Sequence, residues 1–161
     1  MYEAAFEGCW WKAKSILKIH KGAATHAITE NGNTILHVAV EMGHNYFIEK
    51  LLELLNEEDT EKPNHMGQTA LHIAAVVGNE YAAQLLVQKR KQLLVIEDNF
   101  YRSPFDIAVL NGTHISAYLF KSLLSSGLSP DPDPRDAFVA VCAAINAKQY
   151  GELQGMVTLL G

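Results

Sequence analysis

A six-residue motif that recurs along the chain constrains its fold more than any other feature. Residues 34–39 read Thr-Ile-Leu-His-Val-Ala, and residues 69–74, which begin 35 positions later, read Thr-Ala-Leu-His-Ile-Ala. A third copy at 103–108 begins 34 positions after the second and has aspartate in place of the histidine. A fixed period of this length is the signature of stacked structural repeats. The sequence therefore predicts a repeat array.

A glycine follows each copy four residues after its last alanine, at Gly43, Gly78 and Gly112, and Gly8 continues the series upstream. Together these residues resemble the ankyrin repeat, whose unit of roughly 33 residues forms a β-turn and two helices and carries a Thr-Pro-Leu-His-x-Ala signature. The resemblance implies an all-α ankyrin repeat solenoid of paired antiparallel helices with short β-hairpin-like loops. We expect one array over 1–161, with units at about 1–29, 30–63, 64–97, 98–129 and 135–161, the first and last incomplete or degenerate.

Each motif also carries residues that start and end a short helix. Thr34 and Thr69 are expected at N-cap positions with a histidine three residues on, and Ser103 with Asp106 reads as a Ser-x-x-acid capping box. Pro104 fits the first helical position, where its missing N–H costs nothing. The glycine series suits a left-handed residue at the end of the helix, after which the chain reverses into a second helix.

Apolar residues at the spacing of one helical face follow the glycines and predict the buried side of each second helix. In the first three units they are Ala13, Ile16 and Leu17; Ile48, Leu51 and Leu52; and Ala83, Leu86 and Val87. In the fourth unit we expect the apolar stripe to shift toward Leu119, Leu123 and Leu124. A degenerate fifth unit is expected after the proline-rich run 127–134.

Composition and charge agree with one folded array and restrict its partners. The chain is 48% apolar and 19% charged, an ordinary globular balance. Its 13 basic and 18 acidic residues give a net charge of −5, which argues against nucleic acid as a partner because phosphate binding needs a basic surface. No apolar run reaches the roughly 20 residues that a bilayer requires, so direct membrane insertion is not predicted. Cys9 and Cys142 lie in different units and predict buried thiols in a reducing, cytoplasmic environment.

Residues that carry chemistry are present, but not in catalytic or metal-binding patterns. His37 and His72 belong to the repeat motif itself, and the other histidines show no metal-ligand spacing. The aspartates at 131, 133 and 136 lack the turn glycine and distal glutamate of a calcium loop, and the acidic stretch 57–61 reads as an exposed, solubilising linker. We therefore predict no enzyme activity, no cofactor and no metal.

What remains is a surface for a protein partner. The resemblance places the variable, partner-binding positions at the hairpin tips and in the two residues before each helix-ending glycine, on the concave face of the solenoid. These positions are Phe6 and Glu7; Glu30, Asn31, Asn33, Glu41 and Met42; His65, Met66, Gln68, Val76 and Val77; and Asn99, Phe100, Arg102, Leu110 and Asn111.

An apolar stripe is expected from six of these positions: Met42, Met66, Val76, Val77, Phe100 and Leu110. The six residues either form an exposed patch that binds a partner or pack beneath the hairpins, and the sequence leaves both readings open. The leading hypothesis is a non-catalytic protein interaction module that binds through the concave face.

A narrower resemblance points to one branch of the family. The run Tyr-Glu-Ala-Ala at 2–5, a tryptophan soon after Gly8, and the run 31–39 look like the plant ankyrin proteins that carry a membrane domain with a Pro-Gly-Gly motif at the C-terminus. This resemblance implies defence, cell-death or salt-stress signalling at the cytoplasmic face of a membrane, with the membrane tether beyond Gly161. Both ends of the chain look unfinished, so a piece of a longer protein or a truncated product is expected. The alternative hypothesis is thus the soluble regulatory part of a membrane-attached signalling protein.

Overall fold

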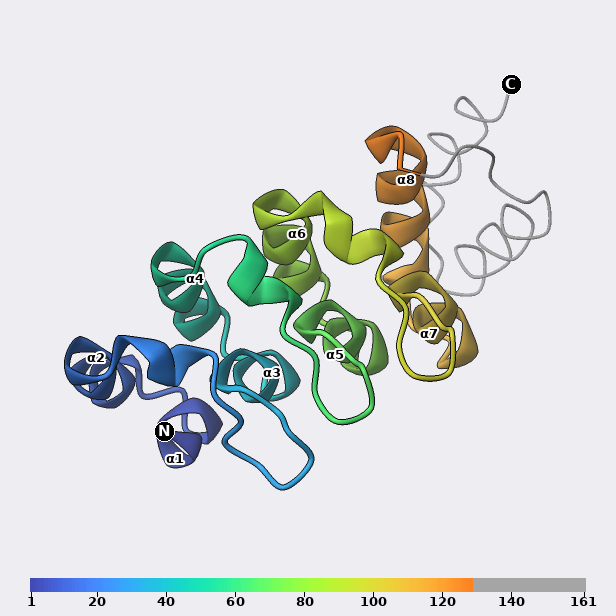
Figure 1. Ribbon diagram of the computed structural model, residues 1–161. Coiled ribbons are helices and arrows are strands. Elements are labelled where there is room, and N and C mark those ends of the chain that lie inside the picture. The colour runs from blue at the N-terminus through green and yellow to red at the C-terminus, as the bar shows by residue number, and fades with distance from the viewer. Residues whose placement is uncertain (129–161) are drawn as a thin grey trace.

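The computed structural model describes residues 1–128, and this part of the chain is a row of helix pairs (Figure 1). The short inner helices are α1 (Tyr2–Phe6), α3 (Ile35–Glu41), α5 (Ala70–Val77) and α7 (Pro104–Leu110). The longer outer helices are α2 (Trp10–Ile19), α4 (Asn45–Leu54), α6 (Glu80–Lys89) and α8 (Ser116–Ser126). The 3₁₀ turns η1 (Lys21–Ala24), η2 (Glu58–Glu61) and η3 (Lys91–Val95) follow α2, α4 and α6. The described residues hold no strand beyond an isolated bridge between Ala27 and Thr34, which confirms the predicted all-α solenoid.

The helices form two rows. Inner helices lie side by side, with α3 packed against α1 and α5, and α5 packed against α7. Outer helices form the second row, and the loops that precede α3, α5 and α7 project from the inner row (Figure 1). The second, third and fourth units therefore each present a hairpin and one face of the inner helix along the same side of the array.

The predicted capping boxes start the inner helices. The backbone N–H of Thr34 donates to Nδ1 of His37 at 3.1 Å, and the hydroxyl oxygen of Thr34 accepts from the backbone N–H of the same histidine. In α7 the partner is a carboxylate, because the N–H of Ser103 donates to Oδ2 of Asp106 at 2.8 Å. Pro104 occupies the first helical position, as predicted.

The glycine series ends the inner helices in the left-handed conformation that was predicted. The φ angles are 69° at Gly8, 73° at Gly43, 72° at Gly78 and 62° at Gly112. Only glycine adopts this conformation without steric cost, so the sequence position of the glycine sets where the chain reverses into the outer helix.

The core lies between the two rows and is continuous from the first unit to the fourth. Ile48 and Leu51 of α4 and Leu86 of α6 are fully buried, as the helical spacing predicted. Ile16 of α2 is only half-buried. At the start of the same helix, the Trp10 ring packs edge-on against Phe47 with centroids 5.4 Å apart, which ties the first outer helix to the second.

The predicted shift of the apolar stripe in α8 is only partly right. Leu119 is fully buried, but Leu123 and Leu124 are half-buried at the margin of the core. Ala117 and Phe120, in the positions that the earlier units use, stay fully buried. The reason is that Phe120 fills its position against the Phe105 ring of α7, with centroids 5.4 Å apart, so the helix keeps its original face toward the core.

The predicted fifth unit, Cys142 and the aspartates at 131, 133 and 136 lie outside the described residues. The division of the chain into five units therefore stays a prediction.

Candidate functional site

Two buried histidines connect the hairpins before α5 and α7 to the preceding units. Nδ1 of His37 accepts the N–H of Thr34, so the ring proton sits on Nε2, which donates to the carbonyl of Gln68 at 2.9 Å. His72 repeats this arrangement one unit later and reaches the carbonyl of Arg102 at 3.2 Å. Asp106 takes the equivalent place in the fourth unit. A carboxylate has no N–H, so it cannot donate a further bond of this kind to a following unit. Each histidine therefore links its own unit to the next one along the chain.

Burial fixes the charge state of these histidines. Loss of solvation lowers the pKa of His37 to about 4, although its hydrogen bond to the carbonyl of Gln68 acts in the opposite direction. Burial lowers the pKa of His72 as well. Both rings are neutral at pH 7, with each nitrogen held by a backbone partner. Their prediction as structural rather than metal-binding residues agrees with this geometry.

Each loop before an inner helix is a closed hairpin. Asn64 N–H donates to the carbonyl of Gln68 at 2.9 Å, and Oδ1 of Asn64 accepts the N–H groups of Met66 at 2.9 Å and of Gln68 at 3.0 Å. Asp98 repeats this role in the fourth unit, where its N–H donates to the carbonyl of Arg102 at 2.9 Å. An Asn or Asp side chain that bonds its own turn in this way pre-forms the loop.

Neighbouring hairpins are joined to one another through the backbone. The N–H of His65 donates to the carbonyl of Asn31 at 3.0 Å, and the N–H of Asn99 donates to the carbonyl of Met66 at 3.0 Å. Two side-chain bonds reinforce these contacts, from Asn64 to Oδ1 of Asn33 at 2.9 Å and from Asn99 to the carbonyl of His65 at 3.0 Å. The hairpin tips therefore form one connected ridge.

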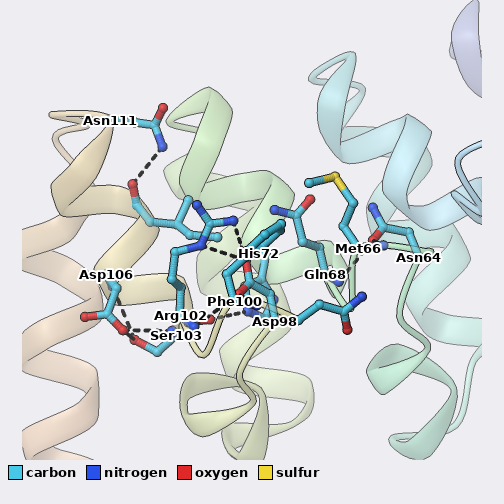
Figure 2. Close-up of polar contacts among 12 residues, drawn as sticks. Asn64, Met66, Gln68, His72, Asp98, Phe100, Arg102, Ser103, Asp106 and Asn111 are labelled. Carbon is cyan, nitrogen blue, oxygen red and sulfur yellow. Dashed lines mark hydrogen bonds and ion pairs between the residues drawn. The ribbon is translucent and has the colours of Figure 1, made fainter.

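The hairpin of the fourth unit carries a partly buried ion pair, in which the carboxylate is buried and the guanidinium is half-buried (Figure 2). Arg102 donates twice to Oδ2 of Asp98, at 2.9 Å and 2.6 Å, and its guanidinium lies 4.8 Å from the centre of the Phe100 ring. Burial alone would raise the pKa of the Asp98 carboxyl, but the hydrogen bonds from Arg102 and from the N–H of Phe100 hold it below its usual value. Tyr101 stands at the tip with φ of 58°, in the left-handed region that glycine occupies in the other hairpins.

The six apolar positions of the predicted stripe are exposed rather than packed beneath the hairpins. Their exposed fractions run from 37% at Met42 to 69% at Leu110, with Phe100 at 60%. Met66 and Phe100 lie on successive hairpins, and Val76 and Leu110 lie on successive inner helices. The other predicted positions are exposed too, with three exceptions.

Those three exceptions are Gln68, Asn33 and Arg102. The prediction that Gln68 lies on the surface is wrong, because the hairpin closes on this residue and leaves it only 8% exposed. Asn33 and Arg102 are half-buried, and each side chain already has a partner, Asn64 for Asn33 and Asp98 for Arg102. The polar groups of Asn33 and Arg102 therefore stabilise the hairpins themselves.

A hollow of about 880 Å³ opens at the N-terminal end of this surface, between α1, α3 and the hairpin that precedes α3 (residues 28–33, the first hairpin). Six of its lining residues were predicted: Phe6, Glu30, Asn31, Asn33, Glu41 and Met42. Four were missed: Tyr2, Ile28, Thr29 and Val38. Tyr2 is four residues before Phe6, so the two residues share one face of the helix. This spacing could have predicted Tyr2 as a surface residue beside Phe6.

Two other predictions are corrected by the structure. Cys9 is half-exposed rather than buried, and its thiol lies 3.6 Å from the carboxylate of Glu7, because it occupies the solvent-facing start of α2. The acidic stretch is not simply a solvated linker, since Arg90 of the next unit reaches Glu61 at 2.7 Å and Glu57 at 3.1 Å. That contact crosses about thirty residues of sequence, so no local pattern indicated it.

Residues 1–128 hold no group of three or more His, Cys, Asp or Glu side chains placed to bind a metal ion. Within the same span, the helices are all too short or too polar to cross a bilayer.

Comparison with known proteins decides the family. The family model described as ankyrin repeats (3 copies) matches residues 1–96. The chain belongs to the ankyrin repeat family. Proteins of this family are typically non-catalytic, and membership indicates a protein interaction module, as predicted.

Solved structures agree with this fold. A chain in the crystal structure of the yeast ribosomal protein Rps3 in complex with its chaperone Yar1 matches with a TM-score of 0.69 and 23% identity. The match covers 82% of this ankyrin chain and 94% of that one. At this identity the similarity establishes the fold alone. No curated protein matches the sequence, and neither comparison supports the narrower resemblance to plant ankyrin proteins with a membrane domain.

Proposed function

We propose that this ankyrin array is a non-catalytic interaction module that binds a protein partner with its concave surface, formed by the hairpins and the exposed faces of the inner helices. The observation that carries the proposal is the exposed apolar stripe, which continues over successive hairpins and successive inner helices. Contiguous apolar residues rimmed by polar groups mark partner sites, because their exposure to water is unfavourable until a partner covers them.

The chemistry of the stripe favours a protein over a small ligand. Phe100 offers a large, exposed aromatic surface, and methionines such as Met66 adapt their shape to the partner. The hairpins that carry both residues are held by the backbone bonds described above. Binding to a pre-formed surface loses less conformational entropy than binding to a loose loop, so this ridge suits specific recognition.

The test changes Met66 and Phe100 together to Asp. Peptides are first selected from a random display library against the full chain, and their affinities for the wild type and for M66D/F100D are then measured by calorimetry. We expect at least a tenfold loss for the variant, since anchor residues contribute on the order of 1–2 kcal/mol each. The matched control is W11D/Y46D, which makes the same change at exposed, equivalent positions of α2 and α4.

Circular dichroism checks that both variants keep their helices. If every selected peptide binds M66D/F100D as tightly as the wild type, the stripe is not the site and the proposal fails.

A second proposal rests on the resemblance of residues 2–5 and 31–39 to plant ankyrin proteins with a membrane domain. In it, the array is the cytoplasmic regulatory part of a membrane-attached signalling protein of the plant defence type. Reading the coding sequence beyond Gly161 tests this proposal, which requires a membrane domain downstream and is abandoned if the transcript stops there.

A further inference from the structure

The hollow beside α1 differs in chemistry from the rest of the inner surface. Tyr2 and Phe6, which lie one turn apart on α1, stack with ring centroids 5.7 Å apart and an interplanar angle of 23°. Both rings are about half exposed, and Met42 faces the same hollow from the end of α3. The hollow therefore has an aromatic and aliphatic lining that is open to solvent.

Carboxylates accompany this lining, and no lysine or arginine does. Glu41 lines the hollow from α3, and Glu30 lines it from the tip of the first hairpin. Both side chains are exposed, and within residues 1–128 neither forms an ion pair. Lys12 is already paired with Glu7, the residue that follows α1, at 2.8 Å. The hollow thus presents two uncompensated negative charges beside exposed rings.

The polar groups that remain are largely committed to the hairpin. Oγ1 of Thr29 accepts the N–H of Asn33 at 3.0 Å, and the side-chain oxygen of Asn33 accepts from Asn64 at 2.9 Å. Of the lining groups, the two carboxylates are the strongest acceptors left for a ligand.

The two carboxylates of the hollow have no counterpart at the equivalent positions of the third and fourth units. The position of Glu41 is taken by Val76 in the third unit and by Leu110 in the fourth. The position of Glu30 is taken by His65 and then by Asn99. At these two positions the inner surface therefore carries carboxylates in the second unit and none in the third and fourth.

We infer that the hollow binds lysine or arginine side chains of a basic, amphipathic segment of a partner protein, whose apolar residues continue onto the stripe. Long basic side chains match both features, because their aliphatic stems can lie on the rings while their charged ends reach the carboxylates. This inference rests on the proposed function and specifies the chemistry of the partner.

The first experiment uses two synthetic amphipathic peptides that share the same apolar residues and differ only in carrying lysine or glutamate at every charged position. The full chain should bind the lysine peptide and not the glutamate peptide. The variant E30Q/E41Q, which removes the charges with little change in shape, should weaken binding of the lysine peptide about fivefold to tenfold. The reversal E30K/E41K should weaken it further, and added salt should reduce the difference between the variants.

The control variant is E53K/E58K, which makes the same change in net charge at exposed positions of α4 and η2. The lysine peptide should keep its affinity for this variant. An equal loss in E30K/E41K and E53K/E58K would mean that net charge alone attracts the peptide, and the inference would be overturned.

Failure of the inference is distinguishable from failure of the proposed function. If library peptides that depend on Met66 and Phe100 carry no basic residues and bind E30K/E41K unchanged, the acidic hollow is not a site, while the stripe remains one. If no selected peptide depends on Met66 and Phe100, the proposed function fails first.

Discussion

The buried histidine bridge makes the stability of the array depend on pH, and the size of the effect follows from the structure. His37 is 1% exposed, and its pKa falls from 6.5 to about 4 on folding. Protonation would place a proton on Nδ1, where the N–H of Thr34 already points at 3.1 Å. The folded ring therefore resists the proton that the unfolded chain accepts.

The direction follows from which state binds more protons. Below pH 6.5 the unfolded histidine is protonated and the folded one is not, so stability is complete at higher pH and falls as the pH drops toward 4. For a shift of this size, His37 alone should lower the free energy of unfolding by about 1 kcal/mol at about pH 6 and by about 2 kcal/mol at about pH 5. His72 adds to the loss in the same direction.

Urea unfolding at a series of pH values measures this loss, with circular dichroism and tryptophan fluorescence as probes. A loss of about 2 kcal/mol should move the urea midpoint by about 1 M. His37→Gln supplies the comparison, because glutamine can still donate an amide N–H but does not titrate. The variant should be less stable at neutral pH and lose less stability on acidification. If wild type and variant show the same pH dependence, the charge state assigned to His37 is wrong.

Two further predictions concern the hairpin backbone. A Cβ added at Gly32 would lie 2.5 Å from Cδ2 of His65, whereas one at Gly43 would meet no atom within 4 Å, and φ is positive at both. We therefore expect Gly43→Ala to cost about 1 kcal/mol and Gly32→Ala to cost clearly more in urea unfolding; equal losses would contradict the close approach of the hairpins. Tyr101 has φ of 58° and is 84% exposed, so Tyr101→Gly should relieve backbone strain and stabilise the array by about 1 kcal/mol. A thermal midpoint that falls instead would show that the tyrosine side chain contributes more than the strain costs.

Much of the local structure was predictable because its signals are local. The capping pair of Thr34 and His37 lies within one helical turn, and the glycines that end the inner helices need no partner from elsewhere in the chain. The fully buried residues of α4 and α6 were predictable because apolar residues spaced three and four positions apart lie on one face of a helix. The period of the motif then predicted that the same unit would stack repeatedly.

The candidate surface was predictable only in part, because sequence position within a hairpin does not determine exposure. Met66 and Gln68 are two residues apart on one hairpin, and yet Met66 is 45% exposed while Gln68 is buried. The resemblance to known repeats assigned both to the surface. Gln68 is enclosed because its hairpin closes onto Asn64 while His37 of the preceding unit binds its carbonyl.

The sequence by itself thus determined the repeat, the limits of its inner helices and much of its core, because capping, glycine conformation and helical spacing all act within a few residues. The tertiary structure decided how the units join and what the surface offers. The bonds from His37 to Gln68, from Arg90 to Glu61 and from Asn99 to Met66 connect residues about 30 positions apart. Such contacts exist only once one unit has stacked on the next, and the acidic hollow beside α1 arises in the same way, between elements that the chain brings together only by folding.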